Sequence, residues 1–346
     1  MTSKIRVLVV DDSAFVRKVV KEMLSRSPQI EVVGIARDGL EALEKVEELN
    51  PDVVTLDHIM PNLDGVGFLL EQMVRRPLPV VVASIASETG QMLLQALDAG
   101  AVDFVQKPTA LATDKVFEIS DDLTRKVIAA AGVPVQKLIQ PFESEETQPL
   151  PLKKGPVGID AVVLGISTGG PHALKILIPR IPADFPVPVA VVLHMPIGYT
   201  ELFARQLDQL SLVTVKEAEE GDLFSPGTVF VAPAGRHLTF IKSPSGDISA
   251  HLSARPFDTL HRPSVDVLFH SAAEVFKNRV LAVVMTGMGS DGTEGARSIH
   301  ESGGRIFTES EESCVVYGMP RSVSEAGLSE RHVPLIQMAY AIMEAV

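Results

Sequence analysis

The stretch VVLGISTGG, residues 162–170, decides how the second half of the chain folds. Its apolar, β-branched start is typical of a buried strand, and the glycines after it predict a tight turn into a helix. Residues Gly165–Gly169 also have the G-x-S-x-G spacing of a serine nucleophile held on a strand-to-helix turn. Because any short strand-to-helix connection needs glycines, the spacing alone leaves both a nucleophile at Ser167 and a plain turn open.

Strand-like and helical segments alternate from this stretch to the end of the chain. A β region with several turn signals, residues 213–253, interrupts the alternation. The pattern predicts a doubly wound α/β domain with a β-hairpin insertion. The expected strands include 161–167, 187–194 and 280–286, and the expected helices include 169–178, 199–210 and 264–276.

Three polar residues lie where strands of this domain end. Ser167 follows the first strand, His194 ends the next one, and Asp291 follows the strand at 280–286. The carboxyl ends of parallel strands meet at one edge of a sheet, so these side chains can converge. A serine hydroxyl needs a histidine base, and the imidazole needs a carboxylate that fixes its tautomer. The three residues therefore predict a Ser-His-Asp hydrolytic site.

Other residues compete for these roles. His172 falls on the first turn of the next helix, where a cap is the stronger interpretation. Asp222 and Asp266 are alternative acids, and Asp266 fits the first turn of its helix as a cap. The remaining histidines have no comparable position at a strand end: His237, His251, His261, His270, His300 and His332.

The loop at residues 287–292 raises a second possibility, because its G-x-G-x-x-G spacing also fits a nucleotide site. Glu309, at the end of the following strand, would then be the acid that binds the ribose. An acid inside the loop would, however, repel a pyrophosphate at the helix N-terminus. We therefore rank this alternative below the hydrolytic site.

The first half of the chain contains five short β-branched runs separated by amphipathic helical stretches. These runs predict a flavodoxin-like (βα)5 domain with a parallel sheet. They are residues 5–10, 31–36, 53–57, 79–84 and 102–105. Polar residues again follow the strand ends: Asp11, Asp12, Asp57, Ser84 and Lys107. Three converging carboxylates would repel one another unless a divalent cation neutralised them, which predicts a Mg²⁺ site.

Composition limits which macromolecules the protein can bind and where in the cell we expect it. The chain has a net charge of −13 and no basic half or basic recognition helix, which argues against a nucleic-acid partner. No apolar run is long enough to span a bilayer, and the N-terminal segment is too short for a signal peptide. We therefore expect a cytoplasmic protein without membrane insertion. The single cysteine excludes an intrachain disulfide.

The motifs VLVVDDSAFVRKVV (7–20) and DVVTLDHIMPNLDG (52–65) resemble the receiver domain of two-component response regulators. The resemblance implies that Asp57 accepts a phosphoryl group from a histidine kinase. It also implies that Asp12, Asp57 and the carbonyl of Ile59 hold Mg²⁺, with Asp11 oriented through water. His58 departs from the usual apolar residue at its position, and we expect it to face solvent without a role.

The motif AVDFVQKP (101–108) extends the same resemblance. It implies that Lys107 pairs with the phosphoryl oxygens and that Ser84 hydrogen-bonds one of them. Phe104 would be the aromatic residue that repacks on activation, and the bond between Lys107 and Pro108 would be cis.

The second half resembles the catalytic domain of the chemotaxis protein-glutamate methylesterases. The resemblance rests on GISTGGPHAL (165–174), HRPSVDVLFHSAA (261–273) and VVMTGMGSDGTEGA (283–296), among other motifs. It implies that Ser167 attacks a glutamate methyl ester of a chemoreceptor, with His194 as base and Asp291 orienting it. Thr168 would help to position the imidazole, and the Met288 amide would contribute to the oxyanion hole. Glutamine deamidation would use the same acyl chemistry, and neither reaction needs a cofactor.

The predicted organisation is a receiver domain at 1–125, a linker at 126–156 and a methylesterase catalytic domain at 157–346. Much of the linker is rich in Pro, Glu, Ser and Thr. We expect the unphosphorylated receiver to cover the catalytic edge and phosphorylation to open it. The alternative is a receiver-controlled binding module without hydrolase activity. Chemoreceptors and a chemotaxis histidine kinase are the expected partners.

Overall fold

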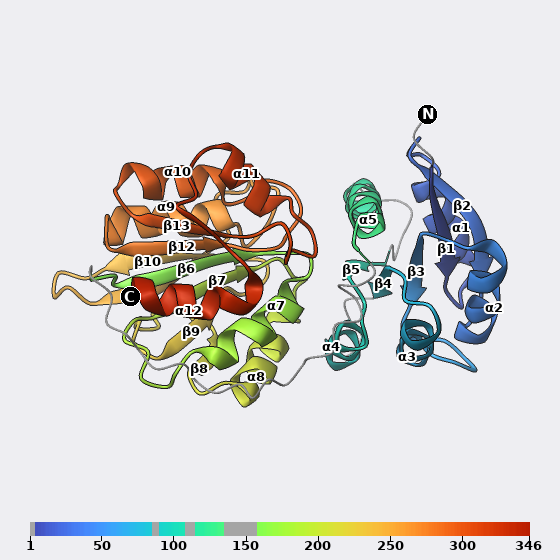
Figure 1. Ribbon diagram of the computed structural model, residues 1–346, viewed down its shortest axis with the longest axis horizontal. Coiled ribbons are helices and arrows are strands. Elements are labelled where there is room, and N and C mark those ends of the chain that lie inside the picture. The colour runs from blue at the N-terminus through green and yellow to red at the C-terminus, as the bar shows by residue number, and fades with distance from the viewer. Residues whose placement is uncertain (1–3, 85–89, 108–114, 135–157) are drawn as a thin grey trace. The chain divides into compact units, whose positions relative to one another are not determined.

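The computed structural model of the protein describes residues 4–84, 90–107, 115–134 and 158–346. The chain divides into two compact units, Met1–Glu143 and Ser144–Val346 (Figure 1). Each unit contains its own parallel sheet covered by helices. No helix among the described residues combines the length and the apolar character that crossing a bilayer requires.

The first unit is a five-stranded parallel sheet with the strand order β2-β1-β3-β4-β5. Helices α1 and α5 contact each other on one face, while α2, α3 and α4 pack in series on the other. The strands are β1 (Ile5–Val10), β2 (Ile30–Ala36), β3 (Val53–Asp57), β4 (Val80–Ser84) and β5 (Asp103–Gln106). The helices are α1 (Ala14–Leu24), α2 (Gly39–Leu49), α3 (Gly65–Arg75), α4 (Gly90–Asp98) and α5 (Lys115–Ala131). The flavodoxin-like prediction is confirmed, and each strand starts or ends within one residue of the expected range.

Helix α5 continues past residue 125, where the receiver domain was expected to end. The helix ends at Ala131, and the side chains of Leu123, Val127 and Ala130 are buried. This spacing of three to four residues keeps one apolar face of the helix on the sheet. The first residues of the expected linker at 126–156 therefore belong to this helix, and residues 135–157 lie outside the described part of the chain.

The second unit contains a seven-stranded parallel sheet with the order β14-β13-β12-β6-β7-β9-β8 and a separate antiparallel hairpin. The sheet strands are β6 (Ala161–Ile166), β7 (Val189–Leu193), β8 (Thr214–Glu217), β9 (Thr228–Val231), β12 (Val280–Val284), β13 (Arg305–Glu309) and β14 (Arg331–Val333). The hairpin consists of β10 (His237–Lys242) and β11 (Ile248–Ser253). A doubly wound sheet with a hairpin insertion is thus confirmed.

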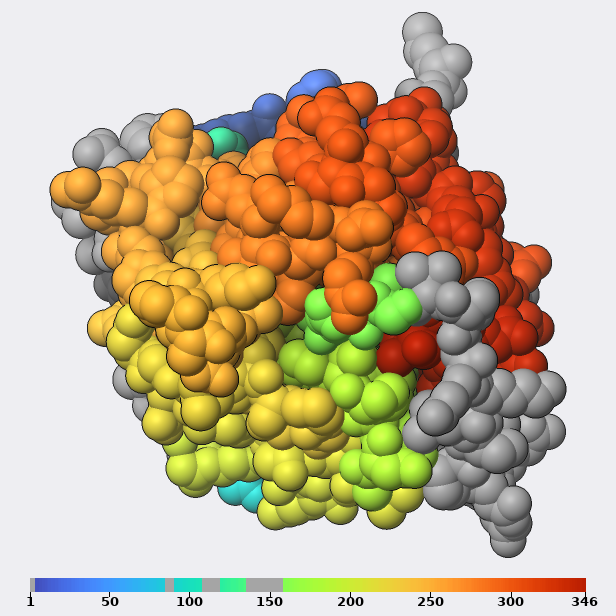
Figure 2. Space-filling view, turned by 90° about the vertical axis from the view of Figure 1, so that its left-hand side faces the viewer, coloured from blue at the N-terminus to red at the C-terminus, as the bar shows by residue number. Residues whose placement is uncertain are grey.

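Helices cover both faces of this sheet. One face carries α9 (Val265–Phe276), α10 (Thr293–Glu301) and α11 (Met319–Glu325), and the hairpin packs against α9. The other face carries α7 (Gly170–Leu177), α8 (Thr200–Leu210) and α12 (Leu335–Ala345) (Figure 1). Figure 2 shows one face of this unit, on which segments from its green beginning to its red end share the surface. Because the chain crosses the sheet repeatedly, residues far apart in sequence meet at the same edge of the sheet.

The strand order changes direction at β6, which lies between β12 and β7. All six residues of β6 are buried, consistent with a central parallel strand covered on both faces. The chain leaves β6 toward β7 on one side and enters the other side only at β12. Crevices form at the carboxyl ends of strands where such a switch occurs.

Candidate active site and phosphoryl-acceptor site

Ser167 and His194 leave neighbouring strands at the same level. Strands β6 and β7 are in register up to the pair Ile166 and Leu193, so the next residue of each strand is Ser167 or His194. The His194 amide donates to the Ile166 carbonyl at 3.2 Å, which extends the ladder by one more bond. On the other side of β6, the Ser167 amide donates to the Thr286 carbonyl at 3.0 Å. The switch point of the sheet therefore holds both side chains.

The imidazole of His194 is oriented by Asp291. His194 Nε2 lies 2.8 Å from Asp291 Oδ2, although the two residues are 97 positions apart. Because a carboxylate only accepts hydrogen bonds, this contact places the ring proton on Nε2. The buried Nδ1 atom has no hydrogen-bond partner among the described residues. The structure thus leaves Nδ1 as the nitrogen that can accept a proton.

Asp291 caps helix α9 from outside the helix. Its carboxylate accepts hydrogen bonds from the Ser264 hydroxyl at 2.9 Å and from the amides of Val265 and Asp266 at 2.8 and 3.0 Å. Burial raises the pKa of Asp291, but the His194 contact and the backbone N–H groups of α9 hold that pKa well below its usual range. The orienting carboxylate is therefore ionised at neutral pH.

Asp266 performs the reciprocal role for helix α10. Its Oδ1 atom accepts hydrogen bonds from the amides of Gly292 at 2.9 Å and Gly295 at 2.8 Å. Burial raises the pKa of this carboxyl, and the neighbouring Asp291 carboxylate acts in the same direction. Asp266 is thus a cap, but of α10 rather than of its own helix. Asp222 instead binds Lys216 at 2.9 Å in a turn beside β8.

Two histidines that do not follow a strand of the parallel sheet also belong to the site. The ring of His261 stacks on the ring of His194, with centroids 4.1 Å apart and an interplanar angle of 22°. His237 is fully buried and accepts a hydrogen bond from the Ser264 amide at 3.1 Å through Nδ1. Sequence reasoning set both aside because neither follows a sheet strand of the core. The only available signal was that His261 lies three residues before Ser264, the N-cap of α9.

The loop after β12 supplies the third side of the site. Met288 follows Gly287, and its amide donates to no other described backbone group. The neighbouring segment Gly318–Met319 donates instead to the Gly287 carbonyl, at 3.1 and 2.8 Å. The Met288 amide thus has no backbone acceptor among the described residues, and its role as an oxyanion donor, which the family resemblance implies, stays a prediction. Thr168 is buried, and its carbonyl accepts a hydrogen bond from the Thr286 hydroxyl at 2.9 Å.

Glu309 lies inside the fold. The residue is fully buried, and it accepts hydrogen bonds from the Thr286 amide and the Ser313 hydroxyl, both at 2.9 Å. Glu309 thereby ties the end of β13 to the end of β12. Its place inside the fold argues against the ribose-binding role.

Replacing Gly287 with alanine is expected to lower kcat for ester hydrolysis by about 100-fold, because a misplacement of about 1 Å has that cost. A Cβ atom at this position would lie 2.8 Å from the Cβ of Ser167 and would also meet the Met319 sulfur, so the nucleophile must shift. Methanol release measures the effect, and circular dichroism checks folding. Gly132→Ala is the control, since the nearest atom there is 3.4 Å away. An unchanged kcat would contradict this close packing.

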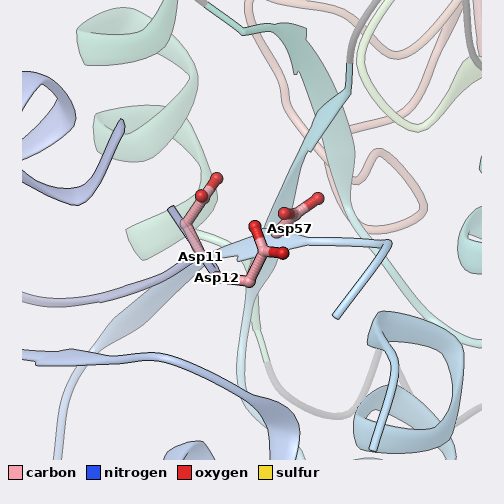
Figure 3. Close-up of side chains that lie close together, drawn as sticks. All are labelled: Asp11, Asp12 and Asp57. Carbon is pink, nitrogen blue, oxygen red and sulfur yellow. The ribbon is translucent and has the colours of Figure 1, made fainter. Parts of the chain in front are cut away.

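In the first unit, three carboxylates converge at the carboxyl ends of β1 and β3. Ligand atoms of Asp11, Asp12 and Asp57 lie within 4.8 Å of one another (Figure 3). Lys107 Nζ approaches Asp57 Oδ2 at 2.6 Å and Asp11 Oδ2 at 3.0 Å. Helix α1 begins just beyond this cluster, where the Ser13 hydroxyl caps the Val16 amide. The sheet and this helix start thus fix the acidic pair relative to Asp57.

The charges of this cluster fit a divalent cation. Burial raises the pKa of Asp11, and the Asp57 carboxylate adds to the rise, although Lys107 opposes it. Burial lowers the pKa of Lys107, but the hydrogen bond and charge of Asp57 raise it above its usual value. One ammonium among three carboxylates leaves two negative charges uncompensated. Hard oxygen ligands in this arrangement suit Mg²⁺.

The other receiver residues singled out from the sequence are buried, and one expectation needs correcting. Ser84 is the last residue of β4 and Phe104 lies within β5, and both are buried. His58 is also buried, with Nδ1 3.8 Å from Asp57 Oδ1, so the expectation that it faces solvent is wrong. The reason is that His58 directly follows the fully buried strand β3. Pro108, and hence the predicted cis bond after Lys107, lies outside the described residues.

Comparisons with known proteins match a family to each unit. Residues 162–342 match the family model described as CheB methylesterase, and residues 7–115 match the response regulator receiver domain. The chain is 50% identical over 337 residues to a Myxococcus xanthus protein named protein-glutamate methylesterase/protein-glutamine glutaminase 5, covering 97% of this chain and 96% of that protein. A Thermotoga maritima protein named protein-glutamate methylesterase/protein-glutamine glutaminase is 42% identical, covering 99% of this chain and 98% of its own length.

A solved structure is also similar. The crystal structure of the Thermotoga maritima CheB methylesterase catalytic domain is matched with a TM-score of 0.53 and 42% identity, covering 55% of this chain and all of that chain. From the strand-end geometry, the matched models and this near-complete coverage, we conclude that the chain belongs to the CheB methylesterase family and carries a response regulator receiver domain ahead of the methylesterase domain.

Proposed function

We propose that the protein hydrolyses glutamate methyl esters of chemoreceptors, releasing methanol, and also deamidates receptor glutamines. Phosphorylation of the receiver activates both reactions, which produces adaptation in chemotaxis. The observation that carries this proposal is the contact between His194 and Asp291, 2.8 Å long, beside Ser167 at the switch point of the sheet. The names of the relatives point to the same two reactions.

The chemistry follows from the placement of the two nitrogens of His194. Ser167 Oγ attacks the ester carbonyl while its proton passes to His194 Nδ1, and Asp291 stabilises the imidazolium through Nε2. When the tetrahedral intermediate collapses, the C–O bond breaks and the imidazolium protonates the leaving methoxide. Water then attacks the acyl-enzyme with the same base, which restores Ser167 and leaves a glutamate. Ammonia replaces methanol as the leaving group in deamidation.

The loop after β12 stabilises the charge that develops during these steps. The Met288 amide points its donor toward the oxyanion in this proposal, and one such donor contributes on the order of 3 kcal/mol. Thr168 supports the imidazole from the turn after β6. The positions of the two residues support these roles. Thr168 directly follows Ser167 in the chain, and Met288 lies in the loop after β12, the strand that pairs with β6.

The receiver holds the control site. Asp57 accepts a phosphoryl group from the phosphohistidine of a chemotaxis histidine kinase, and Lys107 and Ser84 then bind the phosphoryl oxygens. Asp11, Asp12, Asp57 and the Ile59 carbonyl would hold Mg²⁺, which neutralises charge on the transferred group. Phe104 is buried close to the end of β5 and changes its packing on activation.

Methanol release from methylated receptors, with and without a small phosphodonor, tests this function across about pH 5 to 9. We expect methanol release that the phosphodonor stimulates. Asp291 adds no acid limb in this range, because its pKa lies well below the usual range. A binding module without hydrolase activity would release no methanol at any pH.

A further inference from the structure

Three large apolar side chains are exposed around the catalytic histidine. The exposed fractions are 70% for Ile197, 64% for Phe257 and 75% for Leu260. Ile197 lies next to Gly235, whose amide donates to the Arg262 carbonyl at 2.9 Å. We call the surface formed by Ile197, Arg236, Arg255, Phe257, Leu260 and Arg262 the rim patch.

The rim patch adjoins the catalytic base. Leu260 and Arg262 flank His261 in the chain, and the His261 ring stacks on His194 at 4.1 Å. On the other side, Ile197 lies three residues after His194 in the connection that leaves β7. Residues of the rim patch thus lie close in the chain both to His194 and to the histidine stacked on it.

A buried histidine holds the segment that carries Phe257 and Leu260 in place. The buried His237 contacts the Pro256 carbonyl through Nε2 at 3.1 Å, while its Nδ1 accepts from the Ser264 amide. Burial lowers the pKa of His237, which keeps the imidazole neutral and suited to donate on one side and accept on the other. The segment between Pro256 and Ser264 is thus anchored at both ends, although its apolar side chains remain exposed.

The rim patch is positively charged in an acidic protein. Its three arginines outnumber Asp258, the one acid between Arg255 and Arg262. The guanidinium groups of Arg255 and Arg262 lie over the Phe257 ring, 5.8 and 5.2 Å from its centroid. Stacking keeps these cations beside the apolar surface. The whole chain, in contrast, carries a net charge of −13.

We infer that the rim patch is the docking surface for the protein substrate and that it recognises an amphipathic helix with acidic side chains beside its apolar stripe. The inference rests on the proposed function and names how the substrate is selected. An amphipathic helix presents apolar and charged residues at spacings of three and four, which matches apolar side chains interleaved with arginines. The esterified glutamate is neutral, so its unesterified neighbours supply the negative charge.

Two variants of the full chain separate docking from chemistry. Phe257→Ala combined with Leu260→Ala removes apolar area, and Arg255→Glu reverses one charge. With the phosphodonor present, kcat/KM is measured on a soluble methylated receptor fragment and on N-acetylglutamate γ-methyl ester. We expect each variant to lose about tenfold or more on the receptor fragment, mainly through KM, as for the anchor residues of an interface. Hydrolysis of the small ester is expected to stay within about twofold, since it makes no such contacts.

Matched controls lie on the hairpin. Ile241→Ala removes an exposed apolar side chain, and Lys242→Glu makes the same change of charge there. The Arg255→Glu loss should shrink as ionic strength rises, because the interaction is between exposed charges. An unchanged receptor KM in both variants, or an equal loss on both substrates, would overturn the docking inference. A loss seen only with membrane-embedded receptor would also overturn it and indicate a lipid contact. If the unaltered protein hydrolyses neither substrate, the proposed function itself fails.

Discussion

Replacing Ser167 with alanine is expected to reduce methanol release by on the order of 10⁴-fold or more, because the nucleophile cannot be replaced by its neighbours. The residue lies one position beyond the pair Ile166 and Leu193, next to His194 on the adjacent strand. The amide contact with Thr286 holds its backbone, so removal of the hydroxyl leaves the fold intact. Quantifying methanol from methylated receptors measures the loss.

Ser225→Ala is the matched control, because this serine is exposed beside a turn and its hydroxyl lies near the Thr228 hydroxyl, its one hydrogen-bond partner among the described residues. Mg²⁺-dependent phosphorylation of the receiver should be the same in both variants. If Ser167→Ala still releases methanol at the normal rate, another nucleophile performs the reaction and the assignment of His194 as its base is lost.

Replacing Asp57 with asparagine is expected to abolish stimulation by a phosphodonor while leaving basal hydrolysis in place. The amide cannot accept the phosphoryl group, and it also removes one of the three charges that attract Mg²⁺. Asparagine has nearly the same shape, so the buried end of β3 should keep its structure. The measurement compares initial rates with and without phosphodonor, together with incorporation of radioactive phosphate.

Asp64→Asn is a suitable control in the same unit. Asp64 caps α3 by accepting from the Gly67 amide, and asparagine is an equally good cap. This variant should respond to the phosphodonor like the unaltered protein. Stimulation that persists in Asp57→Asn would show that the switch depends on a different acceptor.

Much of the site could be anticipated because parallel strands end at a common edge. The alternation of apolar runs and helices located β6, β7 and β12 closely enough to place Ser167, His194 and Asp291 on one edge. The same reasoning placed Asp11, Asp12 and Asp57 at the edge of the first sheet. Local sequence carries this information, since burial, strand length and turn residues are determined over a few positions.

Other features required contacts between distant segments. Nothing local distinguishes Asp266 from Asp291, yet the first caps α10 and the second caps α9 and binds His194. His261 stacks on the catalytic ring from the segment before α9, which His237 holds through the Ser264 amide. Sequence reasoning also misjudged His58, which is buried directly after the fully buried strand β3.

The sequence by itself thus determined the two α/β units, their strand ends and the set of polar residues that those ends present. Only the tertiary structure decided which carboxylate meets the imidazole, which ring nitrogen remains to accept a proton, and which exposed side chains border the site. The physical reason is the distance along the chain over which each kind of interaction acts. Strands and turns follow from neighbouring residues, whereas hydrogen bonds between helix starts and loops depend on how separate elements pack.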